Sequence, residues 1–382
     1  MAEEIFRIDK KIGSTMPDND TVIRLARELV SRDSQSPPGG EGDVAQFIFD
    51  YLKGIGLKPE KQYFDQRNNR FNVLVFGSDD ANLMINGHMD TVPINDQKNW
   101  KHNPFGEIAN GKLYGRGACD TKGNIACLLA AMKENFNEKI VYVFNCEEEL
   151  TLNGIKKVLE LRKTKLRNVK YSISLEPTDG KIMMGNKGQY IFEVTAHGKT
   201  THASQPHLGD NAIYKIARAA LRIEEYNKKI NKIKHPLFGH ATASTGVIEG
   251  GTAPNVVPDL AKIAVDRRVL PNESPAKVEK ELRELVKPLE FAFRNRVEAC
   301  ETPLNSRIVK EMQGILKDFK MDNKSYGFTA TTELSEIRKH GIEGAIFGMS
   351  KLNQAHQSDE HVTFEELKTG TRILSSLLKK WD

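Results

Sequence analysis

Short apolar segments alternate with amphipathic helical segments over much of the chain, and this alternation restricts the possible folds most. Strand-like runs lie at residues 71–77, 81–87, 139–145 and 171–176, and helical patterns lie at residues 20–32, 43–56, 124–136 and 154–163. Strands separated by helices of ten or more residues are typical of βαβ units on a parallel sheet. The sequence therefore predicts an α/β fold with a mainly parallel sheet and helices on both faces.

The middle of the chain, residues 184–298, has a different order of elements. Its expected strands lie at 189–198, 242–251, 261–269 and 291–299, and its expected helices at 211–226 and 274–289. The resulting order βαββαβ is that of a ferredoxin-like split βαβ unit. Because α/β patterns resume afterwards, we expect residues 1–183 and 299–382 to form one domain and residues 184–298 to form an inserted α+β domain.

Length and charge agree with two soluble domains. A chain of 382 residues with 39% apolar content exceeds what one hydrophobic core usually serves. The net charge of +5 is spread along the chain, which argues against nucleic acid as a partner. Four cysteines without CxxC spacing are too few for a disulfide framework, so we expect reduced thiols.

No segment of the sequence has the character of a membrane anchor. The N-terminal stretch "MAEEIFRIDKKIGS" lacks the apolar core of a signal peptide. Nowhere do roughly 18 apolar residues run together, as a membrane span requires. The sequence therefore predicts a cytoplasmic protein that has no membrane partner.

Side chains that can bind metal ions follow the ends of the expected strands. In chain order these are His88, Asp90, Asp120, Glu147, Glu148, Glu149, Glu176 and His356. Between His88 and Glu176 the candidates recur at intervals of about 30 residues, roughly one βαβ repeat. Ligand sites in open α/β sheets lie outside the carboxyl ends of the strands, so residues far apart in sequence would meet in one crevice.

The chemistry of these side chains favours metal ions. Three adjacent glutamates, Glu147 to Glu149, repel one another unless a positive charge lies among them. Two histidines with several carboxylates suit zinc, or cobalt or manganese in its place, and two metals sharing one carboxylate would neutralise the cluster. His88 and Asp90 would face the same way on an extended strand, so Asp90 could orient the ligating imidazole.

Each part of this pattern has a simpler explanation when it is taken alone. A His-x-Asp pair on a strand is often a chance match, and a run of glutamates is usually a solvated face or a helix start. An Asp before "TKG" is ordinarily a turn or a helix cap. The ordered combination, with each candidate at a strand end, favours the metal site.

Longer motifs around these residues resemble one protein family. They are "GHMDTVP", Trp100 with "NPF", "GKLYGRGACDTKG", "EEELTLNG", "LEPT", "HASQPHLGDNAI", "GGTAPNVVP", "DRRVLP" and "NQAHQSDEHV". In this order, over nearly the whole chain, they are similar to the di-zinc aminoacylase and carboxypeptidase superfamily, which includes acetylornithine deacetylase and succinyl-diaminopimelate desuccinylase. The resemblance implies an enzyme that hydrolyses linear amides with two divalent metal ions, zinc first, with cobalt or manganese as substitutes.

The resemblance also implies which residues bind the two metals. His88 and Glu176 would hold one ion, Glu149 and His356 would hold the other, and Asp120 would bridge both. The family often has a cis peptide after the bridging aspartate, here between Asp120 and Thr121. The nearby Cys119 and Cys146 are not needed as ligands.

The same resemblance assigns catalytic roles. Glu148 would be the general base, Asp90 would support catalysis beside His88, and Glu147 would lie just outside the ligands. In the family the inserted domain is a lid and dimerisation surface, and a histidine of the neighbouring subunit, here His202, completes the site. The alternative for His202 is a plain surface histidine.

Two further matches concern the substrate. Asn255 and Arg268 correspond to family positions that help to hold it, and the fork of an arginine suits a carboxylate. The alternative for Arg268 is a surface ion pair. The expected partners are therefore a small N-acyl amino acid and a second copy of the chain in a homodimer.

Four functions stay open at this point. The stretches "ATTELSEI" and "NQAHQSDEHV" are most similar to acetylornithine deacetylase, which favours an enzyme of amino-acid biosynthesis that removes an acyl group. A succinyl-diaminopimelate desuccinylase and a dipeptidase or carboxypeptidase are the alternatives within the superfamily. A non-catalytic metal-binding homologue predicts loss of the base or of a ligand, and here all of them are present.

Overall fold

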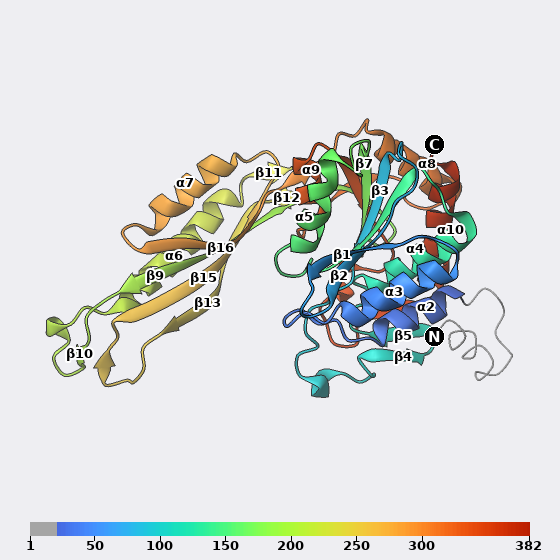
Figure 1. Ribbon diagram of the computed structural model, residues 1–382. Coiled ribbons are helices and arrows are strands. Elements are labelled where there is room, and N and C mark those ends of the chain that lie inside the picture. The colour runs from blue at the N-terminus through green and yellow to red at the C-terminus, as the bar shows by residue number, and fades with distance from the viewer. Residues whose placement is uncertain (1–20) are drawn as a thin grey trace. The chain divides into compact units, whose positions relative to one another are not determined.

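The computed structural model describes residues 21–382, which divide into two compact units (Figure 1). The first unit consists of the chain up to Met184 with Thr302–Tyr326 and Glu336–Asp382, and the second consists of Gly185–Glu301 and Gly327–Ser335. Sequence analysis had not separated residues 327–335 from the rest of the C-terminal part. The N-terminal stretch and the first residue of the expected helix at 20–32 lie outside the described residues. The roles of catalytic domain and lid stay predictions.

The first unit is built on a mixed sheet in the order β1-β2-β6-β3-β7-β19-β8. The strands are β1 (Glu60–Asp65), β2 (Arg70–Val75), β3 (Leu83–His88), β6 (Ile140–Asn145), β7 (Tyr171–Leu175), β8 (Ile182–Asn186) and β19 (Glu343–Phe347). The central strands β6, β3, β7 and β19 are mutually parallel, whereas β1, β2 and β8 pair antiparallel at the sides. The predicted α/β class is confirmed, and the sheet predicted as mainly parallel is a mixed one with a parallel centre.

The apolar strands are buried on both faces. Every residue of β2, β3 and β6 is buried, so helices and loops cover both sides of the sheet. The helices are α2 (Thr21–Val30), α3 (Gly42–Gly54), α4 (Lys122–Asn135), α5 (Asn153–Leu159), α8 (Arg307–Asp318), α9 (Leu334–Lys339) and α10 (Phe364–Lys380). Helix α4 lies between α2 and α10 and packs on β3, and all of its first eleven residues are buried. This burial explains why residues 125–132 within this helix are all apolar.

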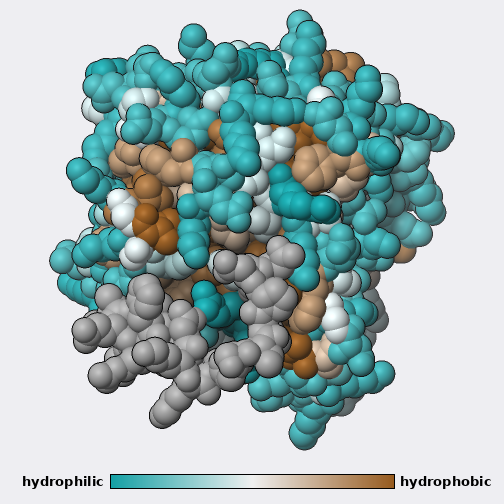
Figure 2. Space-filling model, turned by 90° about the vertical axis from the view of Figure 1, so that its right-hand side faces the viewer, coloured by the Kyte–Doolittle hydropathy of each residue, from teal (hydrophilic) through white to brown (hydrophobic). Residues whose placement is uncertain are grey.

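The outer helices have one apolar and one polar face. Helix α10 begins with a capping box, in which Thr363 and Glu366 exchange hydrogen bonds of 3.1 and 2.8 Å. On the side where α8 and α10 lie, Figure 2 shows a mainly hydrophilic surface with small separate apolar patches.

Among residues 21–382, no helix is both long and apolar enough to cross a membrane.

A small three-stranded sheet, β20-β5-β4, was not predicted. Its strands are β4 (Phe105–Ala109), β5 (Lys112–Gly115) and β20 (His361–Thr363). Asp120 follows β5 and His356 precedes β20. Because β5 and β20 pair antiparallel, the two loops that carry these residues leave the same end of the sheet. This sheet therefore joins two parts of the candidate site.

The second unit has the predicted order βαββαβ. Its main elements are β9 (Gly188–His197), α6 (Ala212–Ile230), β13 (Thr242–Gly250), β15 (Leu260–Val269), α7 (Pro275–Val286) and β16 (Glu290–Val297). The strands form an antiparallel sheet in the order β13-β15-β9-β16. Alternate residues of β9 and β15 are buried in a separate core with α6 and α7, which lie on one face of the sheet (Figure 1). This is the antiparallel inserted unit that the sequence predicted.

Candidate metal and catalytic site

Four neighbouring parallel strands bring candidate ligands to one edge of the first unit's sheet. Strand β3 ends at His88, Glu176 directly follows β7, and the turn Glu147–Glu149 follows β6. The loop after β19 carries His356. Because the four strands are parallel and consecutive, their carboxyl ends lie side by side, as the sequence predicted.

The two carboxylate oxygens of Asp120 face two different histidines. Oδ1 lies 3.2 Å from Nε2 of His88, and Oδ2 lies 3.4 Å from Nε2 of His356. The same Nε2 of His356 lies 3.2 Å from Oε1 of Glu149. Ligand atoms of His88, Asp120 and Glu149 all lie within 4.8 Å of one another. A carboxylate placed in this way between two imidazoles can face two cations at once.

The charges of these groups are strongly coupled. Burial opposes ionisation of Asp120, but hydrogen bonds with His356 and His88 outweigh it and hold the pKa of Asp120 below its usual range. Hydrogen bonds to Asp120 and Glu149 raise the pKa of His356 to about 10. Burial raises the pKa of Glu149. The carboxylates of this cluster therefore favour positive charge close to them.

His88 has a similar environment. Burial acts to lower its pKa, but the hydrogen bond with Asp120 and the negative charges of Asp90 and Glu176 raise that pKa well above its ordinary value. Two imidazoles and three carboxylates form a nitrogen and oxygen donor set that suits Zn²⁺, Co²⁺ or Mn²⁺. Isolated buried carboxylates are costly, so cations in this cluster would remove an electrostatic penalty. The residues therefore fit divalent metal ions.

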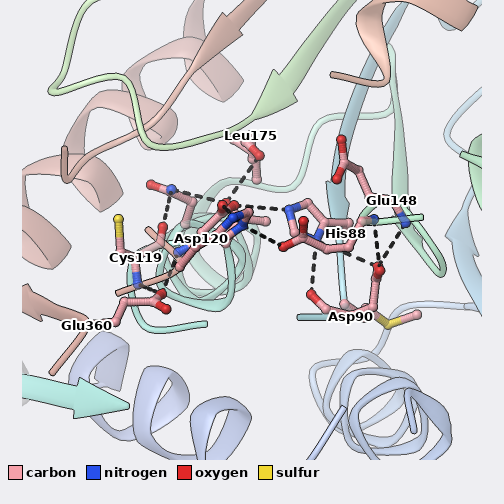
Figure 3. Close-up of polar contacts among 12 residues, drawn as sticks. His88, Asp90, Cys119, Asp120, Glu148, Leu175 and Glu360 are labelled. Atoms are coloured by element: carbon pink, nitrogen blue, oxygen red, sulfur yellow. Dashed lines mark hydrogen bonds and ion pairs between the residues drawn. The ribbon is translucent and has the colours of Figure 1, made fainter. Parts of the chain in front are cut away.

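Asp90 organises the glutamate turn. Its Oδ1 and Oδ2 each accept a backbone N–H, from Glu148 and Glu149, at 3.0 Å (Figure 3). The imidazole Nδ1 of His88 lies nearer to the backbone carbonyl of Asp90, at 3.0 Å, than to its Oδ1, at 3.7 Å. Asp90 thus faces the ring of His88 mainly through its backbone carbonyl, while both of its carboxylate oxygens hold the glutamate turn. Its role in orienting the imidazole stays a prediction.

Sequence analysis missed a buried ion pair behind this turn. Arg70 donates two hydrogen bonds of 2.7 Å to Glu41, and Oε1 of Glu41 also accepts the backbone N–H of Glu147 at 3.2 Å. Glu147 has a left-handed backbone, with φ of 61°. The pair thus anchors the start of the turn. No motif pointed to it, because Glu41 lies in a loop and Arg70 begins a strand.

The neighbours of Asp120 also agree with expectation. The peptide bond between Asp120 and Thr121 is cis, as the resemblance implied. The hydroxyl of Thr121 donates to the carbonyl of Leu175, at the end of β7, at 3.1 Å (Figure 3). Cys119 and Cys146 are buried free thiols, and burial raises the pKa of each. A raised pKa disfavours the thiolate that metal binding requires.

His202 and Asn255 lie together within the second unit. His202 ends β10 (Thr201–His202), which pairs with β14 (Val256–Val257), and the N–H of Ala203 donates to the carbonyl of Asn255 at 2.9 Å. Nδ1 of His202 accepts the backbone N–H of Ser204 at 3.2 Å. Nδ1 also lies 2.7 Å from the hydroxyl of Ser204, and in the tautomer that accepts the N–H of Ser204 the ring proton is on Nε2.

Arg268 is engaged by its own neighbour. Its Nε and Nη2 lie 2.8 and 2.9 Å from the two carboxylate oxygens of Asp266, and its Nη1 lies 3.4 Å from the hydroxyl of Thr331. The side chain is partly exposed. The ion pair named as the alternative for Arg268 is therefore present in the second unit.

Fold and site together define a hydrolase class with a mixed α/β sheet and a cluster of histidines and carboxylates at the carboxyl ends of its parallel strands. Residues 84–380 match the family model described as peptidase family M20/M25/M40. The chain therefore belongs to this family of hydrolases.

Two curated relatives cover most of the chain. Acetylornithine deacetylase of Myxococcus xanthus is 31% identical over 343 residues, 85% of this chain and 88% of the relative. Succinyl-diaminopimelate desuccinylase of Wolbachia pipientis is 28% identical over 285 residues, 69% of this chain and 68% of the relative. The chain is thus similar to members with different acyl substrates.

Solved structures show the same fold. An M20 family metallo-carboxypeptidase of Sulfolobus solfataricus has a TM-score of 0.79 and 20% identity, and the match covers 95% of this chain and 99% of the other. A dinuclear metal-binding peptidase of the M20 family from Bacillus subtilis has a TM-score of 0.66 and 16% identity, with 94% and 97% covered. At these identities the likeness concerns the fold.

Proposed function

We propose that the protein is a metal-dependent amidohydrolase that removes the acyl group from an N-acyl amino acid, with N-acetylornithine as the first candidate substrate. The observation that carries this proposal is the position of Asp120, whose two oxygens face His88 and His356. The relative with 31% identity is named acetylornithine deacetylase, which supports the choice of substrate.

Two divalent ions, zinc or alternatively cobalt or manganese, would be held by five residues. His88 and Glu176 belong to one ion, Glu149 and His356 to the other, and Asp120 to both. When bound, such ions supply Lewis-acid polarisation of the amide carbonyl and make water at the site more acidic. The Bacillus peptidase with this fold is described as dinuclear, which agrees with two ions.

Glu148 is the proposed proton carrier. Its carboxylate accepts a proton from the attacking water and returns it to the amine that leaves. The backbone of Glu148 is fixed by Asp90, while its side chain stays half-buried and points away from Asp90 (Figure 3). Because its backbone is fixed and its side chain is partly open to solvent, the Glu148 carboxylate can exchange protons with water.

His202 is the proposed donor to the developing oxyanion, and it acts on the site of the neighbouring subunit. In the tautomer whose Nδ1 accepts the N–H of Ser204, Nε2–H can donate to that oxyanion. Asn255, joined to the same hairpin, and Arg268 would hold the substrate. Arg268 would exchange its contact with Asp266 for the substrate carboxylate.

The second unit would supply the dimer interface. Strand β13 is an edge of its sheet, and Val247 and Ile248 on this strand are 49% and 59% exposed. On the adjacent helix α6, Tyr214 and Leu221 are 64% and 62% exposed. Exposed apolar side chains at an open sheet edge favour pairing with a second copy.

The test is amine release by chelated protein reloaded with zinc or cobalt. The panel contains N-acetylornithine, N-succinyl-diaminopimelate, other N-acyl amino acids and dipeptides. Metal-dependent turnover with a preference for N-acetylornithine supports the proposal. A preference for the succinyl substrate favours a succinyl-diaminopimelate desuccinylase instead. A preference for dipeptides favours a dipeptidase or carboxypeptidase. Stoichiometric metal with no turnover of any member contradicts the catalytic role.

A further inference from the structure

A buried glutamate outside the proposed ligand set holds the backbone of the proposed bridging residue. Oε1 of Glu360 accepts the N–H of Cys119 at 2.9 Å and the N–H of Asp120 at 3.1 Å. Figure 3 shows Glu360 beside the backbone of these two residues. Glu360 is only 1% exposed, so water competes little for these hydrogen bonds.

The other oxygen of Glu360 binds Arg116, which is also buried. Nη1 of Arg116 contacts Oε2 of Glu360 and donates to the carbonyl of Gln357 at 3.3 Å, and Nη2 donates to the carbonyl of Pro93 at 3.4 Å. One ion pair thus joins three loops. They are the loop that follows Asp90, the loop that carries Asp120, and the loop that carries His356.

We propose that Glu360 is a positioning residue for the metal site, because it fixes the backbone from which Asp120 presents its two oxygens. This inference rests on the metal site proposed above. A bridging carboxylate must aim its oxygens in two directions, so a small rotation of its backbone would displace both contacts. Two hydrogen bonds to a charged acceptor restrict that rotation more than one would.

Glu360 is suited to this role and not to ligation. Its Oε1 already accepts two N–H groups and its Oε2 is paired with a guanidinium, so both oxygens are engaged. Arg116 compensates its charge, which limits the repulsion between Glu360 and Asp120. Without Arg116, the carboxylates of Glu360 and Asp120 would repel each other more strongly.

The adjacent residue offers a matched control. Oδ1 of Asp359 accepts the N–H groups of Lys101 and His102, at 2.9 and 3.0 Å. It therefore performs the same kind of backbone fixation, one residue away, on a loop that carries no proposed ligand. If the effect comes from general loss of loop stability, substitutions of Glu360 and of Asp359 should both weaken metal binding. If it comes from the positioning of Asp120, only the substitution of Glu360 should do so.

The experiment is cobalt titration of the metal-free full-length chain, followed by the visible absorption of bound Co²⁺, for wild type, Glu360→Gln and Asp359→Asn. Loss of the partner that orients a metal ligand typically weakens metal binding 10- to 100-fold. We expect a weakening of about this size and an altered cobalt spectrum for Glu360→Gln, and a change below about threefold for Asp359→Asn. Thermal unfolding of the metal-free proteins checks that all are folded.

The outcomes separate this inference from the proposed function. Equal cobalt affinity and spectra in wild type and Glu360→Gln overturn it, and so does an equal loss in Asp359→Asn. If Glu360→Gln does not fold, Glu360→Asp keeps the charge and withdraws it by one methylene, and the same criteria apply. Wild-type protein that binds cobalt but hydrolyses no substrate contradicts the function alone. Wild-type protein that binds no cobalt contradicts both.

Discussion

At the scale of single residues, the candidate site depends on carboxylates that bind backbone as much as on those proposed to bind metal. Asp90 accepts the N–H groups of Glu148 and Glu149, and Glu360 accepts those of Cys119 and Asp120. Each acceptor thereby fixes a short segment whose side chains converge. Many acidic residues can lie close together here because some accept backbone N–H groups while others are proposed to bind metal ions.

Replacing Glu148 by Gln tests the assignment within the glutamate turn. The amide cannot accept a proton, so turnover should fall by about two to four orders of magnitude. Metal content, measured by elemental analysis, should stay at the wild-type value. Glu149→Gln serves as the comparison and should lose metal. If Glu148→Gln loses metal and Glu149→Gln keeps it, the two roles are reversed.

Cys127 provides a pH-dependent prediction away from the site. Burial between α4 and α10 raises the pKa of this thiol from 9.0 to about 12. Above pH 9 the unfolded chain loses this proton while the folded chain keeps it. The stability contributed by Cys127 is thus complete below pH 9 and declines by about 1.4 kcal/mol per pH unit above it.

The Cys127→Ala variant lacks this dependence. The difference in unfolding free energy between wild type and variant, measured with urea under reducing conditions, should be constant from pH 7 to 8.5. It should shrink by about 2 kcal/mol between pH 8.5 and 10.5. Parallel curves for the two proteins over the whole range would contradict the raised pKa.

At the scale of elements, the sequence predicted the long buried strands but missed polar strands that are recognisable only by their pairing. β3 and β6 are buried along their whole length and are recognisable as apolar runs. Strand β1, with the sequence "EKQYFD", is a polar edge strand, and only one of the five residues of β4 is fully buried. Such strands are held by pairing with a neighbour, which no local pattern reveals.

Gly154, at the start of α5, lies in close contact with the backbone that follows β6. A Cβ at this position would lie 1.9 Å from the carbonyl oxygen of Cys146. Gly154→Ala should therefore displace α5 from the end of β6 and destabilise the protein by about 1–3 kcal/mol. Because the turn Glu147–Glu149 connects the two elements, cobalt affinity should also fall.

The control is the same substitution in α8. A Cβ at Gly314 would meet nothing within 4 Å, and Ala is the better helix former by up to about 1 kcal/mol. Gly314→Ala should therefore raise the unfolding temperature, with cobalt affinity unchanged. Similar changes of unfolding temperature in both variants would show that the approach of α5 to Cys146 is not tight.

At the scale of the whole molecule, the sequence predicted the candidate metal ligands better than the buried residues that hold their backbone in place. His88, the glutamate turn and Glu176 could be predicted because each follows an apolar run, and parallel pairing brings those ends together. Asp120 instead follows a strand of the small sheet, which was not predicted. The supports are loop contacts: Glu41 and Arg70 are 29 positions apart, and Glu360 and Cys119 are 241 apart. Pairings of this kind are fixed only by the folded chain.

Mixing two inactive variants tests whether His202 acts across a dimer. Glu148→Gln lacks the base, and His202→Ala lacks the donor. In a mixed dimer, the His202→Ala chain keeps Glu148 and receives His202 from its partner. After subunit exchange of equal amounts, about a quarter of the wild-type activity should appear. Size-exclusion chromatography with light scattering verifies the dimer, and activity no greater than the mean of the two variants contradicts sharing.

The position of β19 has a consequence for synthesis of the chain. This strand lies between β7 and β8 in the sheet, although in sequence it follows Gly185–Glu301. While a ribosome makes the chain, β7 and β8 are therefore released long before the strand that separates them. A nascent chain that stops before Glu343 has two unsatisfied strand edges and lacks His356. The candidate metal site can therefore be completed only when translation is nearly finished.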